Sequence, residues 1–351
     1  MVRRDIVVVG ASAGGVEALS QLVHRLPADF PAAVFVVLHV SPHGTSLLPS
    51  ILTRNGPLPA RHVADGEPIR PGTIVVAPPD FHLLLEPDRV RLSRGPRENG
   101  HRPAVDVLFR TAARSFGPRV IGVVLSGSLD DGAAGLAAIQ SRGGLALVQE
   151  PDDSLYPGMP RSALESVRAD HCEPVVELAG TLSRLVQEEV RMADDDPTTD
   201  AMKLESAIAA LDLGAIREEQ RPGIVSGFGC PDCGGALWEL RDGELVRYRC
   251  RVGHAWTAHS LVAEQAQAVE SALWSALRAL EERAELCGRI AERLGRRGAN
   301  ATESRFAAQA REARRRAAIL RQVLIADEAT NAEPSPDAPG AAEPGEVATD
   351  G

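Results

Sequence analysis

A serine between two glycines ends the first apolar run of the sequence. Residues 10–14 read Gly-Ala-Ser-Ala-Gly, the G-x-S-x-G arrangement in which a serine lies on a sharp turn from a strand to a helix. Such a turn exposes the hydroxyl of Ser12, and the backbone N–H groups of Ala13 to Gly15 could stabilise an anionic oxygen beside it. The pattern predicts a nucleophilic serine. A plain tight turn or a phosphate-binding loop is the alternative, although the G-x-G-x-x-G spacing of dinucleotide-binding loops is absent.

A histidine and two aspartates follow later apolar runs. His39 lies at the end of the second run, and Asp130 and Asp131 come after a run further along the chain. Reacting groups in open α/β sheets gather at the carboxyl ends of strands, so Ser12, His39 and one of the two aspartates are expected along one edge. There they would form a serine, histidine and aspartate triad. Singly, each has a structural explanation, as a hydrogen-bonded histidine or a helix cap, and their coincidence on three strand ends favours catalysis.

Four potential metal ligands form two close pairs: Cys230 with Cys233, and Cys250 with His254. The pairs are about sixteen residues apart, and the segment between them is predicted to be two strands joined by a turn. This pattern is typical of a zinc ribbon. Four protein ligands would complete the coordination shell, so the zinc is predicted to be structural. Unrelated buried cysteines are the alternative, and His259 could compete with His254 as the fourth ligand.

The remaining cysteines and nearby arginines have simpler explanations. Cys172 and Cys287 are predicted to be core thiols. Zinc ribbons can bind nucleic acids, and four arginines cluster in this one: Arg241, Arg247, Arg249 and Arg251. Trp238, Tyr248 and Trp256, however, are expected to pack the small core of the module and not to stack on bases. No nucleic-acid partner is predicted.

The composition is that of a globular protein with more than one folded unit. Of 351 residues, 44% are apolar and 25% charged, while aromatics make up only 3%, so the core must be aliphatic. The formal net charge of −10 argues against a nucleic-acid backbone as the main partner. Neither a signal peptide nor membrane insertion is predicted, because the apolar runs are short. Clustered cysteines indicate a metal site and a reducing, cytoplasmic location.

The elements that would position the triad alternate between strands and helices. A helix is predicted after Gly14-Gly15, with apolar residues at helical spacing as far as Pro27. The alternation is typical of a doubly wound, mainly parallel α/β sheet with helices on both faces. Residues 81–96 break it and predict a β-hairpin, and therefore a mixed sheet. Five runs predict strands: 5–10, 32–40, 72–79, 119–128 and 143–150.

Composition also predicts the domain order. The catalytic domain should close with a helix over 175–190, and a helical hairpin should turn near residues 295–298. The predicted units are a catalytic domain (1–192), a linker with a short helix (193–226), a zinc-ribbon-like module (227–258), an α-helical hairpin (259–328) and a disordered tail (329–351).

Six blocks, in this order, resemble the catalytic domain of the chemotaxis protein-glutamate methylesterases, the CheB family: VVVGASAGGVEAL, VVLHVSPHG, VVAPPDFHLLL, HRPAVDVLF, VVLSGSLDDGAAGL and YPGMPRSAL. The resemblance covers about residues 1–190. It implies a Rossmann-like esterase that hydrolyses glutamate methyl esters on methylated chemoreceptors and can deamidate glutamines. It implies Ser12 as nucleophile, His39 as base and Asp131 as the triad aspartate, with no cofactor for catalysis.

The sequence departs from the family pattern in several places. The family usually carries an N-terminal phosphoreceiver domain, so control by phosphorylation in the same chain is not expected here. The loop before the triad aspartate usually reads Thr-Gly-Met-Gly and here is Ser126-Gly127-Ser128-Leu129, and the threonine after the nucleophile is Ala13. Two other hypotheses therefore stay open: an esterase-fold scaffold that docks a signalling partner, and a small-molecule carboxylesterase. No oligomeric state is predicted.

Overall fold

The computed structural model describes residues 2–192, 198–217, 223–242, 245–297 and 300–331. The chain divides into two compact units, Met1–Glu264 and Gln265–Gly351. The first unit contains the central sheet and the Cys/His segment, and the second contains most of two long helices.

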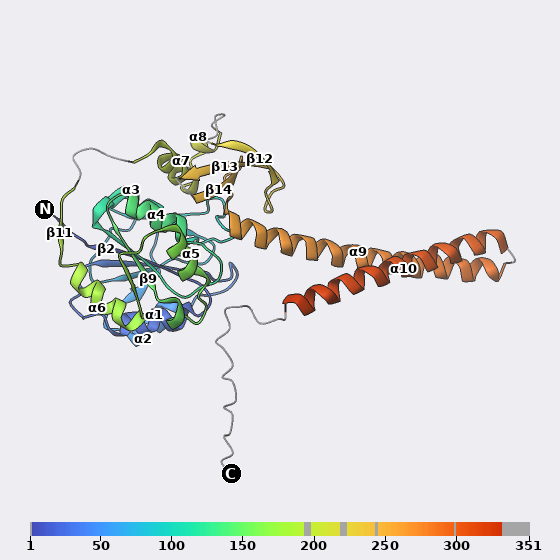
Figure 1. The fold of residues 1–351 in the computed structure, drawn as a ribbon, viewed down its shortest axis with the longest axis horizontal. Coiled ribbons are helices and arrows are strands. Elements are labelled where there is room, and N and C mark those ends of the chain that lie inside the picture. Colours follow the sequence, from blue (N-terminus) through green and yellow to red (C-terminus); the bar gives the residue numbers. More distant parts are fainter. Residues whose placement is uncertain (1, 193–197, 218–222, 243–244, 298–299, 332–351) are drawn as a thin grey trace, which may run out of the picture. The chain divides into compact units, whose positions relative to one another are not determined.

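A parallel sheet of seven strands forms the centre of the first unit (Figure 1). The order across the sheet is β10-β9-β8-β2-β3-β5-β4, so the chain winds outward in both directions from β2. The predicted mainly parallel α/β sheet is therefore confirmed. The strands are β2 (Ile6–Ala11), β3 (Ala33–Leu38), β4 (Ala60–Arg61), β5 (Ile74–Val76), β8 (Val120–Val124), β9 (Leu145–Gln149) and β10 (His171–Glu173).

Helices cover both faces of this sheet, and alternate residues of each strand point to opposite cores. In β2, Val7 and Val9 pack with α1, α2 and α6, while Ile6 and Val8 pack with α3, α4 and α5 (Figure 1). Both faces are buried, which is why the strand sequences are continuously apolar. The helices are α1 (Gly15–His24), α2 (Leu48–Asn55), α3 (Val105–Phe116), α4 (Ala133–Ser141), α5 (Gly158–Ser166) and α6 (Val175–Leu185).

The predicted hairpin is present, but it is separate from the central sheet. Its strands β6 (His82–Leu85) and β7 (Val90–Ser93) pair antiparallel as a two-stranded sheet. Its outer edge is paired by a loop, since the amide of Val90 donates to the Glu67 carbonyl at 2.8 Å. The prediction of a mixed central sheet is therefore wrong for the described strands, because loop backbone, and not a sheet strand, satisfies this edge.

The closing helix is shorter than predicted. α6 ends at Leu185, and β11 (Glu189–Val190) instead pairs antiparallel with β1 (Val2–Arg3). Strand pairing between the two ends of the domain replaces the last helical turn.

A small antiparallel sheet follows the catalytic domain in the first unit. It consists of β12 (Ile224–Gly229), β13 (Ala236–Asp242), β14 (Leu245–Cys250) and β15 (Ala255–Thr257). Two helices precede it, α7 (Asp200–Ala209) and α8 (Leu213–Arg217). The predicted linker thus includes a helix that packs against α3, although residues 193–197 and 218–222 lie outside the described residues.

The second unit contains a helical hairpin. Its helices are α9 (Ala258–Gly295), which begins in the first unit, and α10 (Asn300–Asn331). Leu277 of α9 packs with Ala317 and Leu324 of α10. Part of the predicted turn and residues 332–351 of the predicted tail lie outside the described residues. Within the described parts of the chain, every helix is too short or too polar to cross a membrane.

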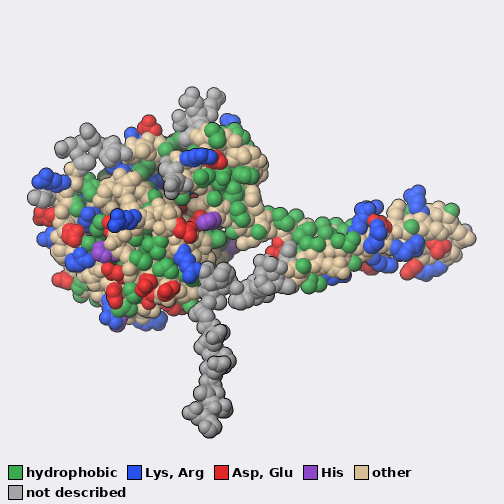
Figure 2. Space-filling model, in the orientation of Figure 1, with side chains coloured by type: hydrophobic (Ala, Val, Ile, Leu, Met, Phe, Trp, Pro, Cys, Tyr) green, Lys and Arg blue, Asp and Glu red, His purple; other side chains and the backbone are tan. Residues whose placement is uncertain are grey.

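Charges of both signs are interspersed on the face of the first unit in view in Figure 2. Of the two cysteines predicted to be core thiols, Cys287 is buried, but Cys172 is exposed. The prediction for Cys172 is wrong because β10, which carries it, is an edge strand with only β9 beside it.

Candidate active site and metal site

Ser12 lies on the turn between β2 and α1. Its amide donates to the Ser126 carbonyl at 3.0 Å, and the amide of Gly15 donates to the Ser12 carbonyl at 2.9 Å. Gly14 has a φ of 69°, a left-handed conformation that a glycine adopts without strain. Among the described residues, the amides of Ala13 and Gly14 have no acceptor and are available to an anion. The amide of Gly15 already donates within the turn, so of the three predicted anion donors it is the one that cannot serve.

His39 follows β3 and joins Ser12 to Asp131. Its Nδ1 lies 3.2 Å from the Ser12 Oγ, and its Nε2 lies 2.7 Å from the Asp131 Oδ2. A neutral ring with its proton on Nε2 donates to Asp131 and leaves Nδ1 to accept from the serine hydroxyl. The three predicted residues therefore lie in one hydrogen-bonded line at the carboxyl end of the sheet.

Asp131 is buried at the N-terminus of α3. Besides His39, its carboxylate accepts from the amides of Val105 at 2.7 Å and Asp106 at 3.1 Å. These are the first amides of the helix, which have no acceptor within it. Burial raises the pKa of Asp131, but the hydrogen bond and charge of His39 and the Val105 donor outweigh it, and the pKa lies well below its usual value. The carboxylate is held ionised beside the imidazole.

Asn99 supports Asp131 from a third side and was not predicted. Its Nδ2 donates to Asp131 at 3.0 Å and to Asp106 at 3.1 Å, so one amide group bridges two buried carboxylates. Burial and the neighbouring Asp131 raise the pKa of Asp106, whose Oδ1 caps α4 through the amide of Gly135. The one available signal was the Asn99-Gly100 dipeptide, which marks a turn.

His101 also escaped prediction. Its ring stacks on the ring of His39, and burial together with His39 lowers the pKa of His101 to about 4. It begins the HRPAVDVLF block that carries the family resemblance, so its position in that block was the signal.

The unusual loop 126–129 contacts the serine turn. The Ser126 hydroxyl donates to the Ala13 carbonyl at 2.8 Å and accepts from the Tyr156 amide at 3.0 Å. At Gly127, a Cβ would lie 2.9 Å from the Ser12 Cβ. Leu129 has a φ of 63°, so leucine here adopts a conformation that favours glycine.

The four predicted metal ligands come together in one cluster. The ligand atoms of Cys230, Cys233, Cys250 and His254 all lie within 4.8 Å of one another. The Cys233 and Cys250 sulfurs are 3.7 Å apart, and the Cys250 sulfur is 3.5 Å from the His254 Nδ1. A tetrahedron with zinc bonds of about 2.1–2.3 Å has edges of roughly 3.5–3.8 Å. These four residues could hold a metal ion, whereas His259 lies near Asp130, 3.7 Å from its Oδ2.

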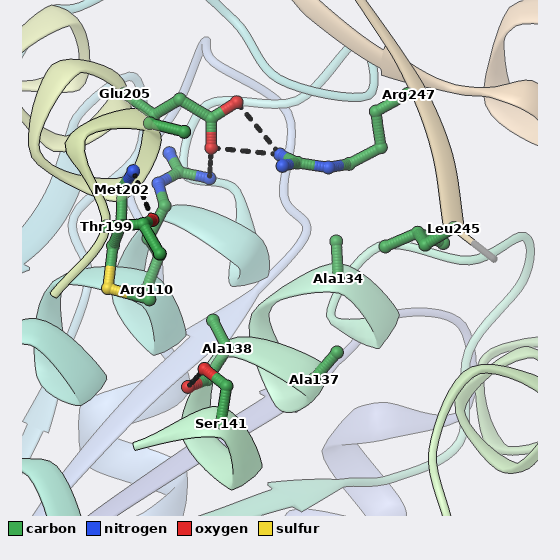
Figure 3. Close-up of a pocket in the computed structure, with 11 residues that line it drawn as sticks. Arg110, Ala134, Ala137, Ala138, Ser141, Thr199, Met202, Glu205, Leu245 and Arg247 are labelled. Atoms are coloured by element: carbon green, nitrogen blue, oxygen red, sulfur yellow. Dashed lines mark hydrogen bonds and ion pairs between the residues drawn. The ribbon is translucent and has the colours of Figure 1, made fainter. Parts of the chain in front are cut away.

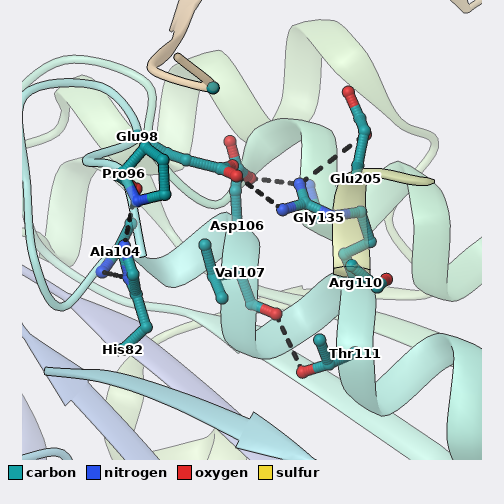
Figure 4. A network of polar contacts seen from close by, with 12 residues as sticks. His82, Pro96, Glu98, Ala104, Asp106, Val107, Arg110, Thr111, Gly135 and Glu205 are labelled. Carbon is teal, nitrogen blue, oxygen red and sulfur yellow. Dashed lines mark hydrogen bonds and ion pairs between the residues drawn. The ribbon is translucent and has the colours of Figure 1, made fainter. Parts of the chain in front are cut away.

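Two arginines of the predicted cluster are buried in ion pairs. The Arg247 Nη1 lies 3.0 Å from Glu205, and the Arg249 Nη2 lies 3.0 Å from Glu98 (Figure 3 shows the former pair). Glu98 also binds Arg110 of α3 at 2.7 Å (Figure 4). Both guanidinium groups are therefore used inside the protein.

A cavity of about 310 Å³ adjoins this network (Figure 3). Its lining includes Arg110, Ser141, Thr199, Met202, Glu205 and Arg247. None of the three triad candidates is among the described residues that line it, so it is separate from the line of hydrogen bonds at Ser12.

Comparison with known proteins gives the family. Residues 7–182 match the family model described as CheB methylesterase. The chain is 38% identical over 186 residues to the protein-glutamate methylesterase/protein-glutamine glutaminase of Symbiobacterium thermophilum. This match covers 53% of this chain and 51% of that protein. A relative from Anaeromyxobacter dehalogenans is 40% identical over 185 residues, covering 53% of this chain and 54% of the relative. The chain thus spans about half the length of these curated relatives.

A solved structure agrees with this result. The crystal structure of the Thermotoga maritima CheB methylesterase catalytic domain matches with a TM-score of 0.51 at 33% identity. The match covers 53% of this chain and 100% of that one. On its sequence and on its fold, the chain belongs to the CheB methylesterase family.

Proposed function

We propose that this protein is a serine esterase that hydrolyses glutamate methyl esters on chemoreceptor-like signalling proteins. The observation that carries the proposal is the line from the Ser12 Oγ through His39 to Asp131, with distances of 3.2 and 2.7 Å. The family membership supports the same chemistry, since the relatives are named protein-glutamate methylesterases.

The proposed reaction proceeds through an acyl-enzyme. The Ser12 Oγ attacks the ester carbonyl while the His39 Nδ1 takes its proton, and the Asp131 carboxylate stabilises the imidazolium that forms. The amides of Ala13 and Gly14 donate to the carbonyl oxygen as it becomes negative. The imidazolium returns the proton to the leaving methanol. Water then attacks the acyl-enzyme, with His39 as base, and releases the carboxylate.

The same steps would deamidate a glutamine, with ammonia leaving in place of methanol. Neither proposed reaction needs a cofactor, because the proton moves between Ser12, His39 and the leaving group. Exposed apolar side chains beside the serine turn favour a protein substrate. Leu155 and Tyr156 are 69% and 46% exposed, and both lie next to Gly14. Such side chains suit contact with the apolar surface of a protein partner.

A fluorophosphonate probe followed by a methanol assay tests the proposal. The wild-type chain should be labelled, Ser12→Ala should not, and Ser141→Ala, which changes an exposed serine at the end of α4, should react like wild type. Methanol release from methylated receptor should exceed release from a panel of small esters. Absence of wild-type labelling would instead support the scaffold hypothesis, and release from small esters alone would support the carboxylesterase hypothesis.

We also propose that Cys230, Cys233, Cys250 and His254 hold a structural zinc. Four protein ligands leave no open position for substrate, and thiolate ligands suit a reducing location, so the cytoplasm stays the predicted compartment. The purified chain should contain one zinc ion, and Cys233→Ser should lose it. The exposed Cys172→Ser should retain the metal, and a metal-free wild-type chain would contradict the proposal.

A further inference from the structure

We infer that the metal module positions the catalytic triad, with Asn99 as the residue through which it acts. The inference rests on the proposed esterase function. The family match ends at residue 182, so the module would supply support for the site from outside the matched region.

The first observation is that β15 binds Asn99 directly. β15 begins at Ala255, the residue after the metal-ligand candidate His254. The amide of Asn99 donates to the Ala255 carbonyl at 2.8 Å, and the amide of Thr257 donates to the Asn99 Oδ1 at 2.9 Å. Because Oδ1 accepts from Thr257, Nδ2 must face the other way, toward Asp131 and Asp106. The module therefore decides the orientation of the amide that supports the triad carboxylate.

A second contact holds the residue next to Asp131. The Asp130 Oδ1 accepts from the Thr257 Oγ1 at 2.7 Å and from the Ser260 Oγ at 2.6 Å. Asp130 is buried, so these hydroxyls replace water around its carboxylate. Through Thr257, β15 thus binds both Asn99, which supports Asp131, and Asp130, which precedes Asp131 in the chain.

A third contact joins the turn between Cys250 and His254 to the segment that contains Asn99. The Arg249 Nη1 donates to the carbonyl of Gly253, which lies between Cys250 and His254, at 2.8 Å. Its Nη2 binds Glu98, the neighbour of Asn99. Glu98 in turn binds Arg110 of α3, the helix whose first amides hold Asp131 (Figure 4).

The metal would fix this arrangement because Cys250 and His254 are its ligands on either side of the turn. Without it, β15 is held to its own sheet by the short pairing of residues 255–257 with β14 and by the packing of Trp256 in the small core of the module. Metal binding contributes directly to the folding free energy of such small modules. Its removal should release β15 and, with it, both backbone partners of Asn99.

The test compares the full-length zinc protein with the same protein after chelation and after zinc is restored. Hydrogen exchange should speed up at least about ten-fold at residues 97–101 and 255–260 on chelation, and stay unchanged in β3. The downfield proton resonance of the His39 Nε2–H bonded to Asp131 should broaden or shift, and labelling of Ser12 should slow about ten-fold. Zinc should reverse all three changes.

Two variants separate positioning from general destabilisation. Asn99→Ala should alter the downfield resonance and slow labelling while zinc remains bound. Thr257→Val, which removes one donor to Asp130, should have a smaller effect in the same direction, and Thr302→Val, at an exposed position of α10, should have none. These variants remain informative if Cys233→Ser fails to fold.

The inference is overturned if chelated protein keeps wild-type exchange at residues 97–101 and labels within two-fold of the zinc form. It is also overturned if the chain binds no zinc. If the zinc protein is not labelled at all, the esterase proposal fails, while exchange and the proton resonance still decide whether the module holds Asn99.

Discussion

The ring of His101 lies flat against the ring of His39, with centroids 3.6 Å apart and planes inclined by 14°. One edge of His39 is bound to Asp131 and one face is covered by His101, so rotation of the imidazole would break both contacts. The pKa of His101 is lowered to about 4 by burial and by His39, so the second ring is neutral at pH 7. It therefore adds no positive charge beside the imidazolium that the proposed reaction requires.

Removing this ring should slow the reaction of Ser12. Stacked aromatic pairs contribute about 0.5–1.5 kcal/mol, which corresponds to roughly two- to ten-fold in rate. We expect His101→Ala to reduce the rate of fluorophosphonate labelling by that factor and His101→Phe to retain most of it. Exposed His43→Ala is the control. Equal rates for His101→Ala and wild type would show that the stacked ring has no role.

Stability should fall as the pH is lowered from about 6.5 to 4. His82 is fully buried between the Pro96 carbonyl at 2.9 Å and the Ala104 amide, and burial lowers its pKa to about 4 (Figure 4). An unfolded histidine has a pKa near 6.5, so within this window only the unfolded state takes up a proton. The free energy of unfolding should therefore decrease by up to about 3 kcal/mol for this residue.

Urea unfolding at several pH values measures this effect. His82→Gln should have a shallower pH dependence than wild type, with a residual slope because His101 titrates in the same range. Gly180→Ala in α6, which changes no ionisable group, should keep the wild-type slope. An unchanged slope in His82→Gln would contradict the assignment of the pH dependence to this ring.

Leu129 should tolerate glycine better than another exposed leucine does. Its φ of 63° costs a leucine about 1–2 kcal/mol, which glycine avoids. Glycine also increases the entropy of the unfolded chain, so the two effects partly cancel. Leu47, 65% exposed with a φ of −90°, lacks the strain. We expect Leu129→Gly to be about 1 kcal/mol less destabilising than Leu47→Gly in chemical unfolding; the reverse order would exclude strain at Leu129.

Gly127 should not accept a side chain. A Cβ there would lie 2.1 Å from the Met159 Sδ and 2.9 Å from the Ser12 Cβ, so Met159 and the serine turn would have to give way. Gly127→Ala should destabilise the fold by about 1–3 kcal/mol and reduce Ser12 labelling at least ten-fold.

Gly180→Ala is the matched control for Gly127→Ala. Gly180 lies in α6, and a Cβ there would meet no atom of the described residues beyond its chain neighbours and the backbone of its own helix. In a helix, alanine should stabilise the protein by about 0.5–1 kcal/mol. Labelling of Ser12 should be unchanged. If Gly127→Ala behaved in the same way, the close packing under Ser12 would have no influence on the site.

The sequence by itself determined the elements and the residue types of the site. The apolar runs before Ser12 and His39 predict strands of a parallel sheet, and strands of such a sheet end at the same edge. The spacing of Cys230 with Cys233, and of Cys250 with His254, is local in the same way, since each pair lies on one turn. These features depend on neighbours along the chain, and so they could be read from it.

Only the tertiary structure distinguished Asp131 from Asp130 by geometry. Asp131 turns to His39 and the first amides of α3, while Asp130 turns to Thr257 and Ser260, more than a hundred residues away in the chain. Asn99 and His101 were likewise decided by folding, because their partners come from distant segments. Adjacent residues have the same local sequence signal, and only packing of remote elements gives each side chain its own partner.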